Sequence, residues 1–184
     1  MPTAEDESLN TDRVAVTVNF AWNRPWVDQW WVALWWAVQV ERCYLGPGVE
    51  PNDTSSYRLI VNAACVALTH VRDWVKSDVA NPLDGPTLAK VFEERQFLKL
   101  ARMVANTAKH RVRSDDNATA AQVVAVIVAV NEDGIPVRTV TIRWKDSTGK
   151  SGTVDALELV RGAVQEWRDV FATNGITDPY PKGL

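Results

Sequence analysis

The amino-acid sequence predicts an α+β fold that is mainly α: a helical bundle with a small antiparallel β-sheet of two to three strands inserted before the C-terminal helix. Apolar residues recur at helical spacing before residue 112, and the period becomes that of β-strands between residues 123 and 154. Helical spacing returns from residue 155. The 184 residues fit a single domain, and the 46% hydrophobic content is sufficient for its core. We expect residues 1–12 to form a flexible acidic tail and residues 13–184 to form the domain.

A tryptophan-rich helix is expected over residues 25–44, after an alternating stretch at residues 14–20 that indicates a strand. Six of the nine tryptophans lie in the first forty residues, and the five within this helix make it apolar nearly all round. Trp31 and Trp35 lie opposite the face that carries Trp26. The helix is therefore either central in the bundle or packed against a second subunit, since aromatic side chains are enriched at interface cores. We predict a homodimer formed through this helix.

Two further helices are expected over residues 55–79 and 87–112. His70 lies at the edge of the first helix's apolar stripe, which comprises Ile60, Ala64, Ala67, Leu68, Val71, Trp74 and Val75. Its polar face comprises Arg58, Asn62, Thr69, Arg72 and Lys76. The second helix is expected to be interrupted near Glu93 and Glu94, because one of these carboxylates would otherwise point inward. Its expected buried face comprises Phe97, Leu100, Ala101, Val104, Ala105 and Ala108.

The sheet is expected from the β-branched run Val123 to Val130, an alternating strand over residues 139–144, and a short third strand that ends near Val154. The last helix should begin at Asp155, which is followed by Glu158 as in a capping box. Asn174 and Gly175 should end it.

A candidate binding site lies on the polar face of the helix over residues 87–112. Its side chains fall within about 80° of Arg102 on the helical wheel. This basic stripe comprises Arg95, Lys99, Arg102, Asn106, Lys109, His110 and Arg113. No carboxylate occurs from Arg95 to Arg113 although the net charge of the chain is −3, which favours a surface for RNA or another polyanion. A solvated face opposite the core is the alternative, and the sequence weighs the two equally.

His70 and Asp73 form a possible second site, since an aspartate three residues along a helix can orient or charge an imidazole. The alternative, which we favour, is a packed histidine with Asp73 in solvent. If the two helices were straight antiparallel neighbours, Asn62 rather than His70 would lie level with Asn106. A break near Glu93 would bring His70 closer to the basic stripe.

Several classes of protein are not supported by the sequence. The two histidines and two distant cysteines have no metal-ligand spacing, and no phosphate-binding glycine loop or nucleophile elbow occurs, so neither a metal nor a cofactor is expected. Asp28, Glu41 and Arg42 interrupt the apolar segment that could otherwise span a membrane. Cys43 and Cys65 are expected to be free thiols in a reducing compartment, which favours a cytoplasmic protein.

The order His-x-x-Asp-Trp from His70, Asn-x-x-Lys-His from Asn106, a β-hairpin and a Trp-containing last helix resembles HEPN-like helical proteins of bacteria and phages. Many HEPN domains are dimeric, metal-independent ribonucleases of toxin–antitoxin and antiphage systems. This chain departs from their motif, because Met103 follows Arg102 where a polar residue is expected. Ala105 likewise precedes Asn106 where arginine is expected.

Three functions stay open, of which the resemblance implies the first two. The favoured one is a HEPN-like binding or regulatory protein of a phage-defence or toxin-type system, whose basic stripe binds RNA or another polyanion. The second is a metal-independent ribonuclease in which His110 acts as general acid or base, Arg102 and Lys109 stabilise the phosphorane and Asn106 positions it. The third is a structural or host-partner-binding protein that acts through the Trp-rich helix.

Overall fold

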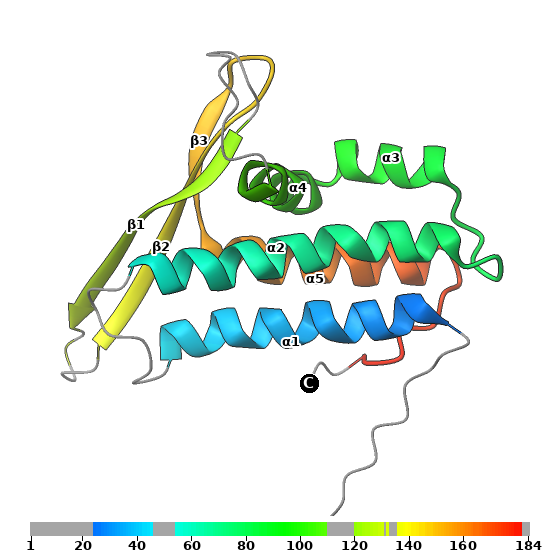
Figure 1. Cartoon of the computed structure of the whole chain (residues 1–184), viewed down its shortest axis with the longest axis horizontal. Helices are drawn as coiled ribbons and strands as arrows, with labels where there is room; N and C mark the ends of the chain where they lie inside the picture. Colours follow the sequence, from blue (N-terminus) through cyan, green and yellow to red (C-terminus); the bar gives the residue numbers. More distant parts are fainter. Residues whose placement is uncertain (1–23, 46–53, 110–119, 131, 133–135, 182–184) are drawn as a thin grey trace, which may run out of the picture.

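The computed structural model describes residues 24–45, 54–109, 120–130, 132 and 136–181. These residues form a helical bundle with a small antiparallel sheet before the last helix, which confirms the predicted fold class (Figure 1). The elements are α1 (Pro25–Leu45), α2 (Thr54–Ser77), α3 (Gly85–Glu94), α4 (Gln96–Lys109), β1 (Ala120–Val130), β2 (Pro136–Lys145), β3 (Ser151–Asp155) and α5 (Ala156–Thr173). The acidic tail and the strand predicted over residues 14–20 lie outside the described residues. Among the described helices, none is both long and apolar enough to cross a membrane.

Three helices, α1, α2 and α5, pack along one another, and the sheet stands at one end of them (Figure 1). α4 is seen end-on in the same view, so it crosses α2 rather than running alongside it. The sheet has the order β1-β2-β3 with antiparallel neighbours. α4 contacts α2, α5 and β1, and it therefore lies where the bundle and the sheet meet.

An aromatic cluster holds the helices together at the centre of the bundle. Phe171 of α5 lies 5.3 Å from the rings of both Trp26 and Trp30 of α1, and 5.5 Å from Trp167. Trp167 in turn packs edge-on against Phe92 of α3 at 5.7 Å. All five side chains are buried, and such pairs stabilise a fold beyond the area they bury.

The predicted interruption near Glu93 and Glu94 is confirmed, because Arg95 separates α3 from α4 with an extended backbone. The break has a packing reason. α3 buries Leu88 and Phe92, whereas α4 buries Leu98. A straight helix would turn Leu98 about 120° away from Phe92, and the break lets α3 and α4 bury these two side chains in different directions. The extended backbone of Arg95 ends the first helix, so α4 can begin with a different axis direction from that of α3 (Figure 1).

Contacts with α5 set that direction. The backbone N–H of Leu98, an unpaired donor of the first helical turn, donates to Oε2 of Glu166 at 2.8 Å. The ring of Phe97 lies on Gly162, where a Cβ atom would come within 2.3 Å of Cδ2 of the ring. α4 is thus tied to α5 at its N-terminal end.

Two residues that were expected in buried faces are exposed instead. Trp74 is 45% exposed, because the buried stripe of α2 is centred one position away, on Val71 and Val75. Ala108 is exposed because it belongs to the last turn of α4, where the helix passes beyond the residues that cover it. The stripe of α2 otherwise agrees with the prediction at Ala64, Ala67, Leu68, Val71 and Val75.

A hydrogen-bond network joins the bundle to the sheet. The hydroxyl of Tyr44 in α1 donates to Oδ2 of Asp155 at 2.7 Å and accepts from the N–H groups of Val140 and Leu157, each at 3.2 Å. Asp155 also caps α5 by accepting from the N–H of Leu157, as the sequence predicted. Burial and the bond to Asp155 raise the pKa of Tyr44, so the phenol stays a donor at neutral pH.

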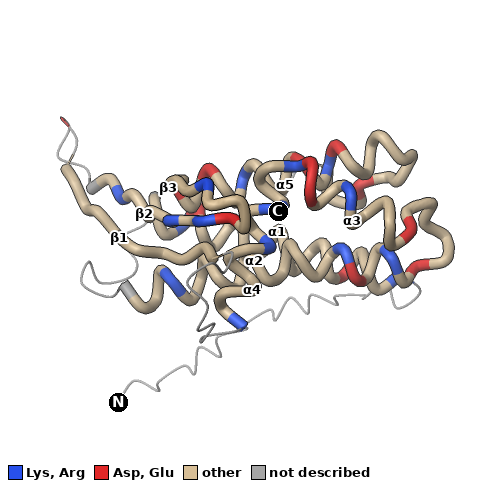
Figure 2. Tube along the Cα trace, turned by 90° about the horizontal axis from the view of Figure 1, so that it is seen from above, with Lys and Arg blue, Asp and Glu red and all other residues tan. Residues whose placement is uncertain are grey.

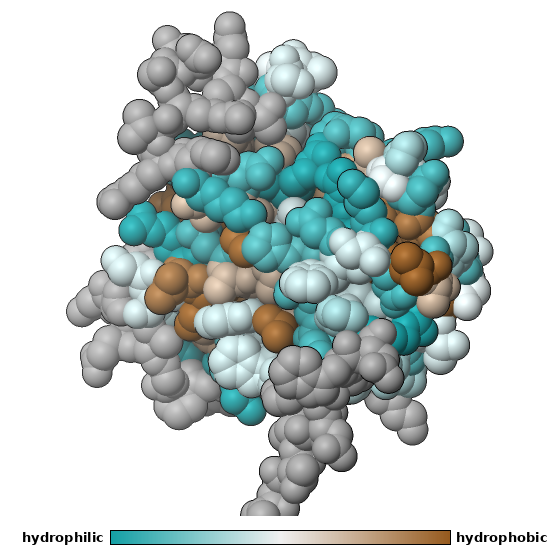
Figure 3. All heavy atoms as spheres, turned by 45° about the vertical axis from the view of Figure 1, so that its right-hand side comes forward, coloured by the Kyte–Doolittle hydropathy of each residue, from teal (hydrophilic) through white to brown (hydrophobic). Residues whose placement is uncertain are grey.

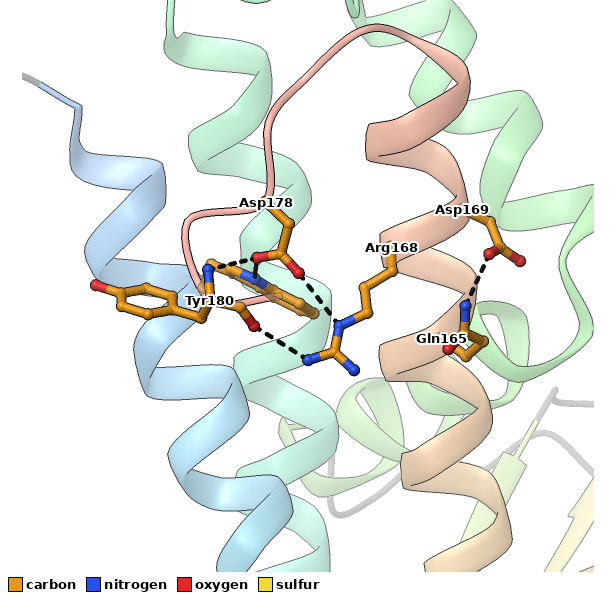
Figure 4. Close-up of polar contacts among 6 residues, drawn as sticks. Gln165, Arg168, Asp169, Asp178 and Tyr180 are labelled. Carbon is orange, nitrogen blue, oxygen red and sulfur yellow. Dashed lines mark hydrogen bonds and ion pairs between the residues drawn. The ribbon is translucent and has the colours of Figure 1, made fainter. Parts of the chain in front are cut away.

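The segment after α5 folds back onto the bundle (Figure 4). The carboxylate of Asp178 accepts from Nε1 of Trp30 at 2.8 Å, from Nε of Arg168 at 3.2 Å and from the N–H of Tyr180 at 2.8 Å. Arg168 also donates to the carbonyl oxygen of Tyr180. α5 itself ends as predicted, with Asn174 at the cap and Gly175 in the left-handed region at φ 67°.

Candidate functional site

The first half of the basic stripe is paired with carboxylates from other helices. Nη2 of Arg102 lies 2.5 Å from Oε1 of Glu93, and Nζ of Lys99 lies 3.4 Å from Oε2 of the same residue. Arg95 lies 3.8 Å from Asp169 of α5. Figure 2 shows the resulting mixture of both charge signs over the helices. The sequence pattern missed these partners because Asp169 belongs to α5, and because Glu93 would lie on the opposite side of a continuous helix from Arg102.

Arg102 is engaged within the fold. Its hydrogen bond to Glu93 holds the pKa of that carboxyl below its ordinary value. Its guanidinium also lies 5.9 Å from the ring centroid of Phe92, within the range of a cation–π contact. The side chain is only 24% exposed. Arg102 therefore fastens α4 to α3, and its charge is offset where the sequence suggested a phosphate ligand.

The other described end of the stripe, Asn106 and Lys109, is exposed. Nζ of Lys109 lies 2.9 Å from Nε2 of His70 in α2. An ammonium has no acceptor lone pair, so the imidazole nitrogen must accept and its proton must sit on Nδ1. The structure thus joins two candidate sites that the sequence left separate. His110 and Arg113 lie outside the described residues.

The surroundings of His70 keep its ring neutral. Burial lowers the pKa of His70 below its ordinary value of 6.5, and the ammonium of Lys109 lowers it further. The charge of Asp73 opposes these effects. Asp73 is exposed, and no hydrogen bond joins it to His70, so Asp73 does not orient the ring. The alternative of a packed histidine with Asp73 in solvent describes this pair better than a catalytic dyad.

A polar groove of about 220 Å³ lies where α2, the end of α4 and the start of β1 meet. Its polar lining comprises Arg58, Asn62, Thr107 and Gln122, and no described carboxylate lines it. Oγ1 of Thr107 accepts from the N–H of Ala121 at 3.1 Å, which fixes the start of β1 to α4. The sequence placed Asn62 level with Asn106 only for straight antiparallel helices, whereas α4 crosses α2 (Figure 1), so no signal in the sequence linked the groove residues to the site.

A second hollow, of about 280 Å³, lies between the break before α4 and the turn that joins β2 to β3. Carboxylates of Glu93, Glu94 and Asp146 line it together with the ammonium groups of Lys99 and Lys150. This mixture of signs does not favour a polyanion. Among the described residues, no group of three or more histidine, cysteine or acidic side chains is placed to hold a metal.

The tryptophans of α1 divide between two environments, as the helical wheel predicted. Trp26 and Trp30 are buried, whereas Trp31 and Trp35 are 38% and 39% exposed. Trp35 also packs edge-on against Trp36 with ring centroids 4.8 Å apart. On the face drawn in Figure 3, polar residues surround small, separate hydrophobic patches. Cys43 and Cys65 are buried free thiols, as expected, and burial raises the pKa of Cys65 to about 12.

Comparison with protein-family models, curated proteins and solved structures finds no significant match to this chain. The function must therefore be inferred from the geometry of the site itself.

Proposed function

We propose that this chain is a binding protein for a polyanion such as RNA, and that the binding surface is the meeting point of α4 and α2 rather than the whole basic stripe. The supporting observation is the Lys109–His70 pair. Lys109 is exposed, and no described carboxylate lies within ion-pair distance of its ammonium. Since Arg95, Lys99 and Arg102 are paired with carboxylates, Lys109 is the described cation of the stripe best able to contact a phosphate.

The neighbouring side chains suit a phosphate backbone. The groove lined by Ala108, which precedes Lys109 in α4, adds the guanidinium of Arg58 and the amides of Asn62 and Gln122, all of which can donate to phosphate oxygens. Asn106 is exposed one turn before Lys109. Contacts of this kind hold a nucleic acid without reading its sequence, so we expect binding that depends strongly on salt and weakly on sequence. A HEPN-like regulatory role in phage defence or a toxin-type system remains part of this proposal, on the resemblance alone.

A metal-independent ribonuclease is the second candidate, and the neutral imidazole of His70 beside Lys109 favours it. When the ammonium of Lys109 turns from Nε2 of His70 to a phosphate, that nitrogen is released and could take the proton of a ribose 2′-hydroxyl as the hydroxyl oxygen attacks phosphorus. The bond to the 5′-oxygen then breaks, and that oxygen takes up a proton. Lys109 would stabilise the pentacoordinate phosphate. His110, which follows Lys109 in the chain, is the expected second acid or base, although it lies outside the described residues.

A third candidate is a protein that acts through the Trp-rich α1, as a homodimer or with a host partner. The exposed rings of Trp31 and Trp35 favour it, because exposed tryptophans are frequent anchors of protein interfaces.

The test is binding of a short, labelled single-stranded RNA, measured by fluorescence anisotropy at low ionic strength. Lys109→Glu should weaken binding about tenfold through loss of one phosphate contact. Lys90→Glu is the matched control, because Lys90 is an exposed lysine of α3 whose ammonium is 3.6 Å from Glu94. An equal loss in both variants, or no affinity in the wild type, would overturn the proposed surface.

Integrity of the same RNA after incubation separates the first two candidates. A ribonuclease should cut the RNA, and His110→Ala or His70→Gln should stop cleavage while affinity is kept. A binding protein should leave the RNA intact.

A further inference from the structure

β1 forms one edge of the sheet, and within the described residues no strand pairs with its outer side. Natural proteins usually protect such an edge with charged side chains, proline or a covering segment, because its free N–H and C=O groups can pair with another chain. β1 has eleven residues and none of them is charged or proline. The strand is without charge colour along its whole length in Figure 2.

The far half of β1 is also the most exposed apolar part of the hairpin. The one irregularity of its pairing with β2 lies between Val123 and Ala125, and regular pairing continues from there to Val130. In this half Ile127 is 56%, Val128 39% and Val130 66% exposed. Successive side chains of a strand point to opposite faces, so the exposed apolar surface lies on both sides of the strand. Exposed apolar surface of this kind marks an interaction site.

We infer that this edge pairs with β1 of a second copy of the chain, antiparallel about a two-fold axis through Ile127. The observation behind this is the sequence of the strand, because residues 124–130 read Val-Ala-Val-Ile-Val-Ala-Val in both directions. An antiparallel partner centred on Ile127 therefore sets every side chain opposite an identical one. The pairs in the regular part of the strand are Ala125–Ala129, Val126–Val128 and Ile127–Ile127, and Val124, at the irregularity, faces Val130 at the end of the palindrome.

This self-complementarity favours a second copy over a different protein. A two-fold interface is isologous, so a palindromic strand satisfies both partners with a single register. No charged side chain in β1 would meet its like across the axis. The two sheets would become one sheet of the order β3-β2-β1-β1-β2-β3, with both β1 edges used. Because no β1 edge is left over, this pairing stops at two copies.

The inference is independent of polyanion binding. It assigns the homodimer, which the sequence placed on the Trp-rich helix, to the sheet instead. The edge of β1 and the exposed tryptophans of α1 can be tested side by side.

The first experiment is light scattering at micromolar concentration. The wild type should have the mass of a dimer, and Ile127→Lys should be a monomer because two ammonium groups would face each other about 5 Å apart. The dissociation constant should rise on the order of 100-fold, about tenfold for each isoleucine removed from the pair. Ile127 is exposed in the single chain, so folding should be retained, which circular dichroism checks.

Thr139→Lys is the matched control, because Thr139 is the exposed partner of Ile127 on β2. Its ammonium would lie about three strand spacings, or about 14 Å, from its symmetry mate, beyond the screening length in physiological salt. This variant should remain a dimer. Trp31→Gln with Trp35→Gln should also remain a dimer.

Cysteine cross-linking tests the axis itself. Under a mild oxidant, Ile127→Cys should form a covalent dimer, because opposed Cβ atoms of an antiparallel pair lie near disulfide distance. Thr139→Cys should not, and the buried Cys43 and Cys65 should not compete. A monomeric wild type, an Ile127→Lys variant that stays dimeric, loss of the dimer in the tryptophan variant, open-ended oligomers, or absence of the Ile127→Cys cross-link would each overturn the inference.

Discussion

The ammonium of Lys109 lies 2.9 Å from Nε2 of His70, and this contact joins the end of α4 to α2. The imidazole must be neutral to accept, and a second positive charge at this distance would be unfavourable. A phosphate beside the pair would change that balance, because its negative charge would favour a protonated ring. The protonation of His70 is therefore expected to depend on both the pH and the presence of a bound phosphate.

RNA affinity should rise as the pH falls from about 7.5 to about 5.5, a range in which histidine commonly titrates. The pKa of free His70 lies below 6.5, and a bound phosphate should raise it, so binding is accompanied by proton uptake. Anisotropy titrations at constant ionic strength measure this dependence. His70→Gln should reduce the slope, and His110→Gln, which changes the only other histidine of the chain, is the comparison. An unchanged slope in His70→Gln would exclude His70 from the bound surface.

Acidification should strengthen RNA binding through His70, but it should lower the free energy of unfolding of the protein through the same residue. A histidine whose pKa is lowered by folding is protonated more readily in the unfolded chain. Its contribution to stability is therefore complete above the unfolded pKa of about 6.5 and is lost as the pH falls through the lower folded value. Urea unfolding of wild type and His70→Gln should show the wild type losing more stability on acidification. If the two curves stay parallel, the pKa of His70 is not shifted by folding.

Glu93→Gln should strengthen RNA binding by about threefold, because it releases Arg102 and Lys99 from their shared carboxylate. Glu94→Gln is the control with the same change in net charge, since Glu94 pairs with Lys90 of its own helix instead. Equal effects of the two substitutions would mean that only the net charge matters. A larger effect of Glu93→Gln would show that the basic stripe is restrained by its ion pairs.

The elements of this fold could be predicted because their signals are local. Asp155, Asn174 and Gly175 lie at the boundaries of α5, and the two acidic residues before Arg95 marked the break before α4. The direction of α4 could not be predicted, since it depends on contacts between Phe97 and Gly162 that are far apart in the sequence.

The same limit applies to the site. A helical wheel of residues 87–112 sets Glu93 about 180° from Arg102, so it missed an ion pair that forms only because the chain breaks between α3 and α4. It also treated His70 and Lys109 separately, because their contact requires α4 to cross α2. The role of His110 stays a prediction.

Tyr44→Phe should destabilise the protein by about 1–3 kcal/mol, because it removes the donor to Asp155 and the acceptor for the N–H of Val140. Tyr57→Phe is a closely matched control. Tyr57 is buried, and its hydroxyl has no hydrogen-bond partner among the described residues. Loss of the Tyr57 hydroxyl should leave the free energy of unfolding unchanged or raise it. Equal destabilisation by both substitutions in urea unfolding would show that the network at Tyr44 contributes nothing specific to the junction between bundle and sheet.

Gly162→Ala tests how α4 is seated on α5. The new Cβ would lie 2.3 Å from Cδ2 and 2.4 Å from Cγ of Phe97, so the whole ring must move. Overpacking of this kind costs about 1–3 kcal/mol, whereas replacing glycine within a helix favours folding by about 1 kcal/mol. We expect a net loss of stability in urea unfolding.

Repeating the substitution in a Phe97→Ala background should reverse its sign, because the clash is removed and only the gain in helix propensity remains. If Gly162→Ala has the same effect in both backgrounds, contact between Phe97 and Gly162 does not seat α4. The orientation of α4, and with it the approach of Lys109 to His70, would then depend on its other contacts, such as the bond from the N–H of Leu98 to Glu166.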